Sequence, residues 1–560
     1  MLGSGFRQDG PLRSLKHRIG RLHLWKAVAF ALGVAFLAPA RSGAQLEVEL
    51  DGKTFTLYDA AALVDDLRHA EAGTVVAYEN AVFQGSFHLS DQIDTVRAAL
   101  QLRDVRFMEP VSFDWSVFAA PVDCERVQFE QGASLLGATF LSDCKLADSR
   151  FGGQARFKRV RFAGEALFDN SVFERRHRPR RELTPRYRGK DAIPTFIEAE
   201  FGGRASFDNS LFGETAYFER CRFLSGSSFV DVNFRYGASF KEGVWEGPAD
   251  FSGSLYFSNT FFQDAVFQDV SFEKTRFAGN VSFSRAEFAG ETTFRQAALL
   301  EEANFDEARF RSYASFTNGR FPHRANFREA VFDDILFLDA HVPGALDLRH
   351  ANGPHIDLRP PTTVAARRAH NDTTTKAPRI YLQDARFDRM VVDWPSIAGG
   401  RLAAEDTASV DDLAPVYSLL RQHLQFQGLD SWAADAQVEW LDRRLHSLTP
   451  AQADWYFLHA LDLTTRYGTQ PLRAILFALL GVVLFGLLYY PVRASIQAEN
   501  TEQLPALVDC FHLSLSAFVR LGWSRWRVTG KARLLVLAEG LLGLAMWGLF
   551  VTSLVAGFLR

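Results

Sequence analysis

Phenylalanine recurs along this chain at a spacing that fits neither a helix nor an ordinary strand. Between residues 201 and 240 it stands at 201, 207, 212, 218, 223, 229, 234 and 240, in alternating steps of six and five. A helical face repeats every three or four residues, and a strand face every two. The residue two places before each Phe that ends a six-residue step is small: Ala205, Ala216, Ser227 and Ala238. A fixed period of this kind indicates an internal repeat that determines the fold.

The same steps run from Phe107 to Phe173, with Cys124, Leu135 and Leu146 in place of Phe. Four steps make 22 residues, which predicts a coil with four sides. We expect the Phe and the small residue to point inward, so that stacked coils place Phe on Phe in four columns. Backbone groups would then pair with the coils above and below. At ~4.8 Å per coil, roughly ten coils predict a rod of about 50 Å.

This pattern resembles the pentapeptide-repeat family in its Phe-centred variant with alternating steps. The resemblance implies a mainly β chain that forms a right-handed quadrilateral β-helix over residues 107–400, after an N-terminal cap region at 45–106. Trp394-Pro395 and Gly399-Gly400 are interpreted as the C-terminal cap, because an open coil end is an edge that must be covered.

Two insertions interrupt the repeat. The first, at 174–195, concentrates basic residues: Arg175, Arg176, Arg178, Arg180, Arg181, Arg186, Arg188 and Lys190. It is interpreted either as an anion-binding loop, for lipid headgroups, polyanionic glycan or nucleic acid, or as a solvated loop extruded at one corner. The second, at 359–378, is rich in Pro, Thr and Arg and is predicted to be a loop.

Residues 1–44 have the layout of a secretory signal peptide. Six Lys and Arg residues precede the apolar run AVAFALGVAFLAPA, and the small residues Ser42-Gly43-Ala44 follow it. This is the order of a basic region, an apolar region and a cleavage site. An uncleaved anchor is the alternative interpretation. Under both, the repeat domain crosses the membrane.

The period changes to helical spacing in residues 405–470. Leu413, Val416, Leu420 and Leu424 share one face, and a second set follows Gly428: Trp432, Ala436, Trp440 and Leu441. This pattern predicts an αα-hairpin as a helical linker.

Residues 471–560 are predicted to form a membrane module with two transmembrane helices, 474–490 and 534–558. Tyr489 and Tyr490 are expected in the membrane interface. Glu539, the one charge in the second helix, is interpreted as snorkelling to the interface, with a role in transport as the alternative.

The segment between these helices, with a pore-loop-like part at 506–526, is similar to the two-helix ion-channel module. ARLLVLAEGLLGL is similar to the start of the inner helix of that family. Together with the repeats, the hairpin and RYGTQPLRA, this resembles bacterial pentapeptide-repeat proteins with a channel-like C-terminus. A filter-like turn is implied at Arg520, Leu521, Gly522, Trp523 and Ser524.

The turn departs from the TVGYG backbone whose ring of carbonyls binds potassium. Arg520 stands at the Thr position and Ser524 at the second Gly, and four Arg520 side chains around a pore would repel cations. The topology adds a conflict. An exported rod leaves this segment in the cytoplasm, in agreement with its basic residues, whereas an ordinary potassium channel has its filter outside.

The sequence therefore predicts a scaffold anchored in a bacterial inner membrane, with a periplasmic β-helix that contacts an unknown protein or anionic partner. The alternative is an ion channel or channel-derived sensor gated by the rod, a homo-oligomer and a tetramer if channel-like. A DNA-mimic role requires a cytosolic acidic rod, so nucleic acid is not expected as a partner.

Enzyme activity is not expected, because no catalytic arrangement or phosphate loop stands out. No cofactor is expected. The four cysteines form no CxxC motif, which disfavours a metal site. Cys124 and Cys144 are interpreted as core residues, with a disulfide as the alternative.

Overall fold

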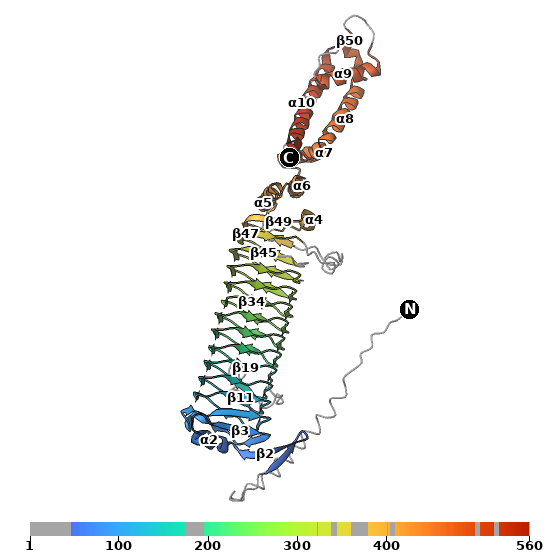
Figure 1. Ribbon diagram of the computed structural model, residues 1–560. Helices are drawn as coiled ribbons and strands as arrows, with labels where there is room; N and C mark the ends of the chain where they lie inside the picture. The colour runs from blue at the N-terminus through green and yellow to red at the C-terminus, as the bar shows by residue number, and fades with distance from the viewer. Residues whose placement is uncertain are drawn as a thin grey trace, which may run out of the picture.

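The protein is a long rod of stacked β-coils that leads into a bundle of helices (Figure 1). The computed structural model describes residues 46–174, 195–321, 323–337, 344–359, 379–399, 401–403, 409–498, 504–519 and 526–558. The predicted mainly β solenoid followed by C-terminal helices is confirmed.

Four columns of short parallel strands form the four faces of the rod. One runs from β4 (Ala81–Gln84) to β39 (Ala298–Leu299), and a second from β5 (Phe87–His88) to β48 (Arg379–Tyr381). The other two begin at β3 (Val75–Glu79) and β6 (Thr95–Val96) and end on two long strands, β47 (Asn352–Asp357) and β49 (Arg386–Val391). Each strand pairs with its counterpart one coil away, so the ladder satisfies the buried backbone.

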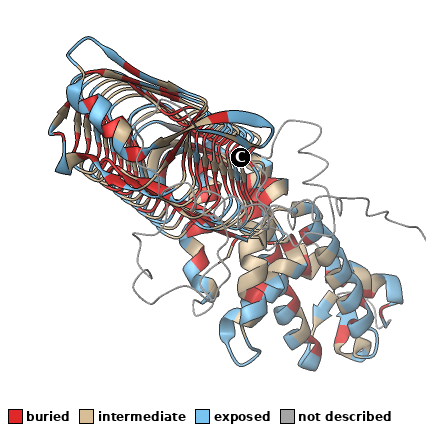
Figure 2. Cartoon of the chain, turned by 90° about the horizontal axis from the view of Figure 1, so that it is seen from below, coloured by how far each residue is buried: buried red, intermediate tan, exposed pale blue. Residues whose placement is uncertain are grey.

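The interior is filled by the Phe ladder. Phe201, Phe207 and Phe212 are buried, and so are the small residues such as Ala205. Phe201 stacks on Phe223 with ring centroids 4.7 Å apart and planes 1° from parallel. Edge contacts join neighbouring columns, as between Phe207 and Phe218. Figure 2 shows the buried residues along the inside of the coils. The predicted inward positions are confirmed.

The stacking continues across the first insertion. Phe157 stacks on Phe196 at 4.6 Å, and Thr195 bridges Arg156 and Tyr217. The insertion thus leaves from one corner without shifting the core. One coil is shorter than the predicted 22 residues: Ala249 pairs with Val270, 21 residues on.

The coils begin earlier than predicted. Residues 45–106 were expected to be a cap region, yet β3, β4, β5 and β6 already pair in register with the next coil. Phe83 stacks on Phe107 at 5.1 Å. The pattern was hidden because aliphatic side chains, such as Val96 and Leu100, fill two of these columns.

A hairpin and a helix close the N-terminal end. β1 (Glu47–Leu50) pairs antiparallel with β2 (Lys53–Asp59), which pairs with β4. α2 (Ala60–His69) is capped by Asp59, whose carboxylate accepts from the Ala61 amide. Its apolar face, with Leu63 and Leu67, is part of the solenoid core.

The C-terminal end is covered by more than the predicted cap. Trp394 of α4 (Trp394–Ile397) is buried as expected. The predicted hairpin forms as α5 (Ala414–Phe426) and α6 (Asp430–Ser447). However, Leu420 and Leu424 of α5 belong to the solenoid core. The segment interpreted as a linker is therefore also the cap.

The remaining elements form the bundle. α7 (Ala453–Thr465) precedes two long apolar helices, α8 (Pro471–Tyr489) and α10 (Gly530–Phe558). Between these lie β50 (Ile496–Ala498), α9 (Leu507–Val519) and β51 (Trp526–Val528), with β50 and β51 antiparallel. α8 and α10 are long and apolar enough to cross a membrane, by length and composition.

Candidate functional site

Both site predictions from the sequence fall outside the described residues. The filter-like turn Arg520–Ser524 lies between Val519 and Trp526, and the basic cluster Arg175–Lys190 lies between Glu174 and Thr195. What the structure adds is their surroundings: the helices that carry the turn, and a hollow on the rod further along the chain.

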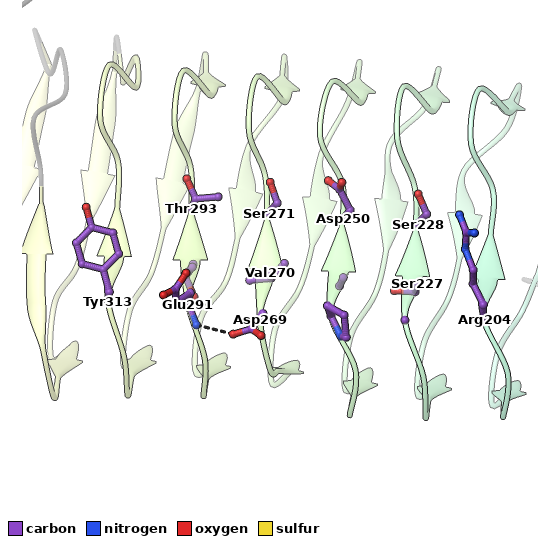
Figure 3. Close-up of a pocket in the computed structure, with 14 residues that line it drawn as sticks. Arg204, Ser227, Ser228, Asp250, Asp269, Val270, Ser271, Glu291, Thr293 and Tyr313 are labelled. Carbon is purple, nitrogen blue, oxygen red and sulfur yellow. Dashed lines mark hydrogen bonds between the residues drawn. The ribbon is translucent and has the colours of Figure 1, made fainter.

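The hollow is a groove of about 460 Å³ along one face of the rod (Figure 3). Its floor is made by four successive strands: β26 (Ser227–Ser228), β30 (Ala249–Asp250), β34 (Val270–Ser271) and β38 (Thr292–Thr293). Arg204 lies at one end and Tyr313 at the other. Between them, the same corner column carries Gly226 and Pro248, whose short side chains leave the space open.

The groove is polar and mainly acidic. Ser228, Asp250, Ser271 and Thr293 form one row along it, one residue from each coil (Figure 3). Asp269 and Glu291 lie in the facing column, and the Asp269 carboxylate accepts from the Glu291 amide at 2.9 Å. Arg204 is the one basic residue among the lining residues described. This row suits a ligand with several donors repeated along an extended chain.

The second candidate site is the bundle, where α9 is a short helix inserted between α8 and α10. Phe511 near its start lies against Gly486, and Phe518 near its end approaches Gly481 and Gly543. A side chain at Gly486 or Gly543 would collide with α9. Small residues allow such close helix packing.

α9 enters the bundle from the end farther from the rod and ends partway down (Figure 1). Phe518 packs with Ala474 and Met546, deep in the bundle. The next described strand, β51, is back at the far end, paired with β50. The segment 506–526 is therefore re-entrant: its described parts begin and end on the same side of the bundle.

A buried carboxylate holds α9 in place. Glu539 of α10 is fully buried and accepts hydrogen bonds from the Tyr489 hydroxyl of α8, at 2.6 Å, and from the Ser514 hydroxyl of α9. Ser514 also lies 2.8 Å from the Val482 carbonyl. Both predictions for this pair were wrong: Glu539 does not snorkel, and Tyr489 faces inward. Tyr490 is partly exposed.

Below the end of α9 lies a cavity of about 340 Å³ whose lining is entirely apolar. Its residues come from α8, α9 and α10: Ala474, Ile475, Ala478, Leu479, Val482, Leu515, Phe518, Val519, Met546, Trp547 and Phe550. A hydrated ion finds no polar partner among these described side chains. A single chain therefore offers no polar path at this cavity.

The rod and bundle are joined by a network of ion pairs. Glu439 of α6 accepts from the Tyr417 hydroxyl at 2.9 Å and from the Gly399 amide at 2.9 Å. Burial, together with the Glu439 charge, raises the pKa of Tyr417, so its hydroxyl stays a donor. Arg443 donates to the Leu402 carbonyl at 2.6 Å.

The next junction is the turn between α7 and α8. Arg466 donates to Asp442 of α6 at 2.6 Å and to Asp462 of α7. Arg466, Tyr467 and Gly468 all have positive φ, which is costly for the first two residues. The Gly468 carbonyl accepts from Ser553 of α10 at 2.8 Å. The turn thus connects α6, α7 and α10.

Comparison with known proteins identifies the rod. Residues 196–244, 240–287 and 272–320 each match the family model for pentapeptide repeats, which spans nine copies. These residues are pentapeptide repeats. The pentapeptide-repeat rod extends the same coil geometry beyond the matched segment on both sides. No curated protein and no solved structure matches the chain.

Two features of these sites escaped the sequence reasoning. The groove had a signal, because Gly226 and Pro248 replace bulky residues at a 22-residue spacing. The partners of Glu539 had none, because Tyr489 and Ser514 come from separate segments whose pairing depends on the depth of α9.

No group of His, Cys, Asp and Glu side chains suited to a metal ion occurs in the described part of the chain. Cys124 and Cys144 are free and buried, in agreement with their interpretation as core residues.

Proposed function

We propose that this protein is a membrane-anchored scaffold that holds a rigid pentapeptide-repeat rod at a fixed distance from a bilayer. The observation that carries the proposal is the continuous junction from the last coil through α5, α6 and the Arg466 turn to α8 and α10. A flexible linker would let the rod swing, whereas this junction makes it project from the bundle. In the proposal, the membrane is the inner membrane of a bacterium and the rod is periplasmic.

Topology mapping tests the anchor. Reporters fused after Gly400, after Asn500 and at Arg560 should read periplasm, cytoplasm and periplasm. If all three read the same side, α8 and α10 do not span and the anchor is wrong. If the first and last read cytoplasm, the anchor stands, but the rod is not exported.

The groove is the proposed contact surface of the rod. Its acidic and hydroxyl lining favours an extended segment with cationic or other hydrogen-bond donors, and it argues against an anionic partner at this face. A photo-crosslinker at Ser271 should capture the partner in intact cells, whereas one at the exposed Tyr236, outside the groove lining, should not. Equal capture at both positions would contradict the assignment.

The second candidate is a channel or channel-derived sensor, and the re-entrant α9 favours it. Re-entrant backbone at membrane depth occurs where it lines a cavity or is buried in protein. Since the cavity of one chain is apolar, conduction would require a pore between several copies. Purified protein in planar bilayers should then show discrete conductance that changes with Arg520→Gly. A flat trace across salts and voltages would exclude it.

A further inference from the structure

Helix α7 has an exposed apolar face with no counterpart in the described chain. Tyr456, Phe457 and Leu463 are 61%, 64% and 53% exposed. With the exposed Ala453 and Ala460 they recur at helical spacing, and they therefore form one stripe. The stripe contains no charged residue.

The opposite face of α7 is also apolar, and it is already used. Leu458, Trp455 and Leu461 pack with Leu445 of α6 in a small core. The charged residues lie outside the stripe, and Asp462 is engaged by Arg466. A helix that is apolar on both faces is typical of a position between a protein core and a second apolar phase.

The position of α7 identifies that phase. The helix contacts both α8 and α10 and lies at the end of the bundle nearer the rod (Figure 1). Leu472, at the start of α8, is 73% exposed, so the apolar surface of α8 begins just beyond the turn. The exposed Arg473 follows it. A Tyr and Phe pair flanked by a cation at the start of a spanning helix has the composition of a membrane interface.

We propose that α7 is an interfacial helix whose Tyr456, Phe457 and Leu463 face inserts into the lipid headgroup layer of the membrane that α8 enters. This proposal rests on the proposed membrane anchor. It gives the Arg466 turn a role: α7, fixed to α6 and α10 by that turn, sets the level at which the rod leaves the bilayer. The chemistry that covers the face is a phospholipid surface, bound through buried apolar area.

The test uses the full chain in vesicles of phosphatidylcholine and phosphatidylglycerol. Nitroxide labels are placed singly on cysteines replacing Tyr456, Phe457 or Leu463. The four native cysteines are buried, so they do not compete. Collision with apolar oxygen and with a water-soluble nickel chelate reports the phase around each label. Phe426, 81% exposed on α5, is the matched control, and Leu480 of α8 reports spanning.

The expected result is an oxygen-to-nickel accessibility ratio at all three α7 sites severalfold above that at Phe426 and close to that at Leu480. A ratio equal to that at Phe426 places the face in water and overturns the proposal. Low access to both reagents with spin–spin broadening shows a second copy on the face, and also overturns it. A high nickel signal at Leu480 itself would instead refute the membrane anchor.

Discussion

At the scale of single residues, the tight turns of the rod explain the five-residue steps. Two positions after the Phe that opens such a step, the backbone adopts positive φ, as at Asn170, Asn209 and Asp231. Asn and Asp tolerate this conformation, but Arg220 and Glu198 occupy it too, at a cost of roughly 1 kcal/mol each. Because coils stack, these turn residues form a ladder in which opposite charges meet.

One such ladder predicts a pH dependence. Arg159 and Arg220 donate to Glu198 at 2.6 and 2.8 Å and lower the pKa of its carboxyl to about 2. The folded pKa lies below the unfolded one, near 4.5, so the pairs stabilise the rod above that pH and are lost as pH falls toward 2. Glu198→Gln should cost about 1 kcal/mol at neutral pH. Thermal unfolding by circular dichroism should show that the difference in Tm shrinks to nothing near pH 2. A difference independent of pH would contradict this account.

The same scale shows why the Phe positions were predictable and the first coil was not. A Phe in an inward column leaves a spacing that no other fold needs, so Phe107 to Phe173 could be placed from sequence. Val96, Leu100 and Leu102 fill the first coils equally well, but aliphatic residues occur in every core. The repeat therefore becomes visible only where its occupants are distinctive.

At the scale of elements, sequence predicted which segments are helical but not what each covers. The Leu413–Leu424 spacing correctly indicated a helix, yet nothing in it shows that Leu420 packs on β-coils instead of a second helix. Similarly, Glu539 near a helix start fits snorkelling equally well, and only the depth of α9 decides that it is buried. Contacts between segments distant in sequence leave no periodic signal.

The docking of α9 gives a prediction with a native reporter. Cys510 of α9 is buried beside Tyr489 and Ile496. Glu539→Ala leaves the Tyr489 and Ser514 hydroxyls without their shared acceptor, at a cost of about 1–3 kcal/mol for each. α9 should then open more often, and the rate of Cys510 labelling by a maleimide should rise about tenfold or more. Glu539→Gln keeps an acceptor and a donor and should change the rate little.

A matched control is Ser516→Ala, since that hydroxyl bonds to the His512 carbonyl of its own helix. It should leave Cys510 labelling unchanged. Equal labelling in the wild type and Glu539→Ala would show that helix packing alone, through Gly486 and Gly543, holds α9.

At the scale of the whole molecule, the rod is a sum of nearly independent coils between two caps. Each coil contacts its neighbours, so local stability adds up along the axis. One coil of 21 residues is accepted without loss of stacking, since Phe251 and Phe272 still lie 5.0 Å apart. The number of coils therefore determines length alone. In the proposed function, it determines how far the α2 end stands from the bilayer.

Removing one whole coil should therefore shorten the protein without unfolding it. Deletion of residues 130–151 joins Phe129 to Gly152, and Phe129 and Phe151 are register partners, so each column keeps its sequence of occupants. The maximum dimension from small-angle X-ray scattering should fall by about 4.8 Å, with Tm nearly unchanged. Deletion of residues 130–148 removes three residues fewer and joins Phe129 to Ser149, which shifts every later Phe off its column. That variant should lose the cooperative transition, because inward positions then receive polar side chains. Equal stability of both variants would show that the Phe register does not hold the rod together.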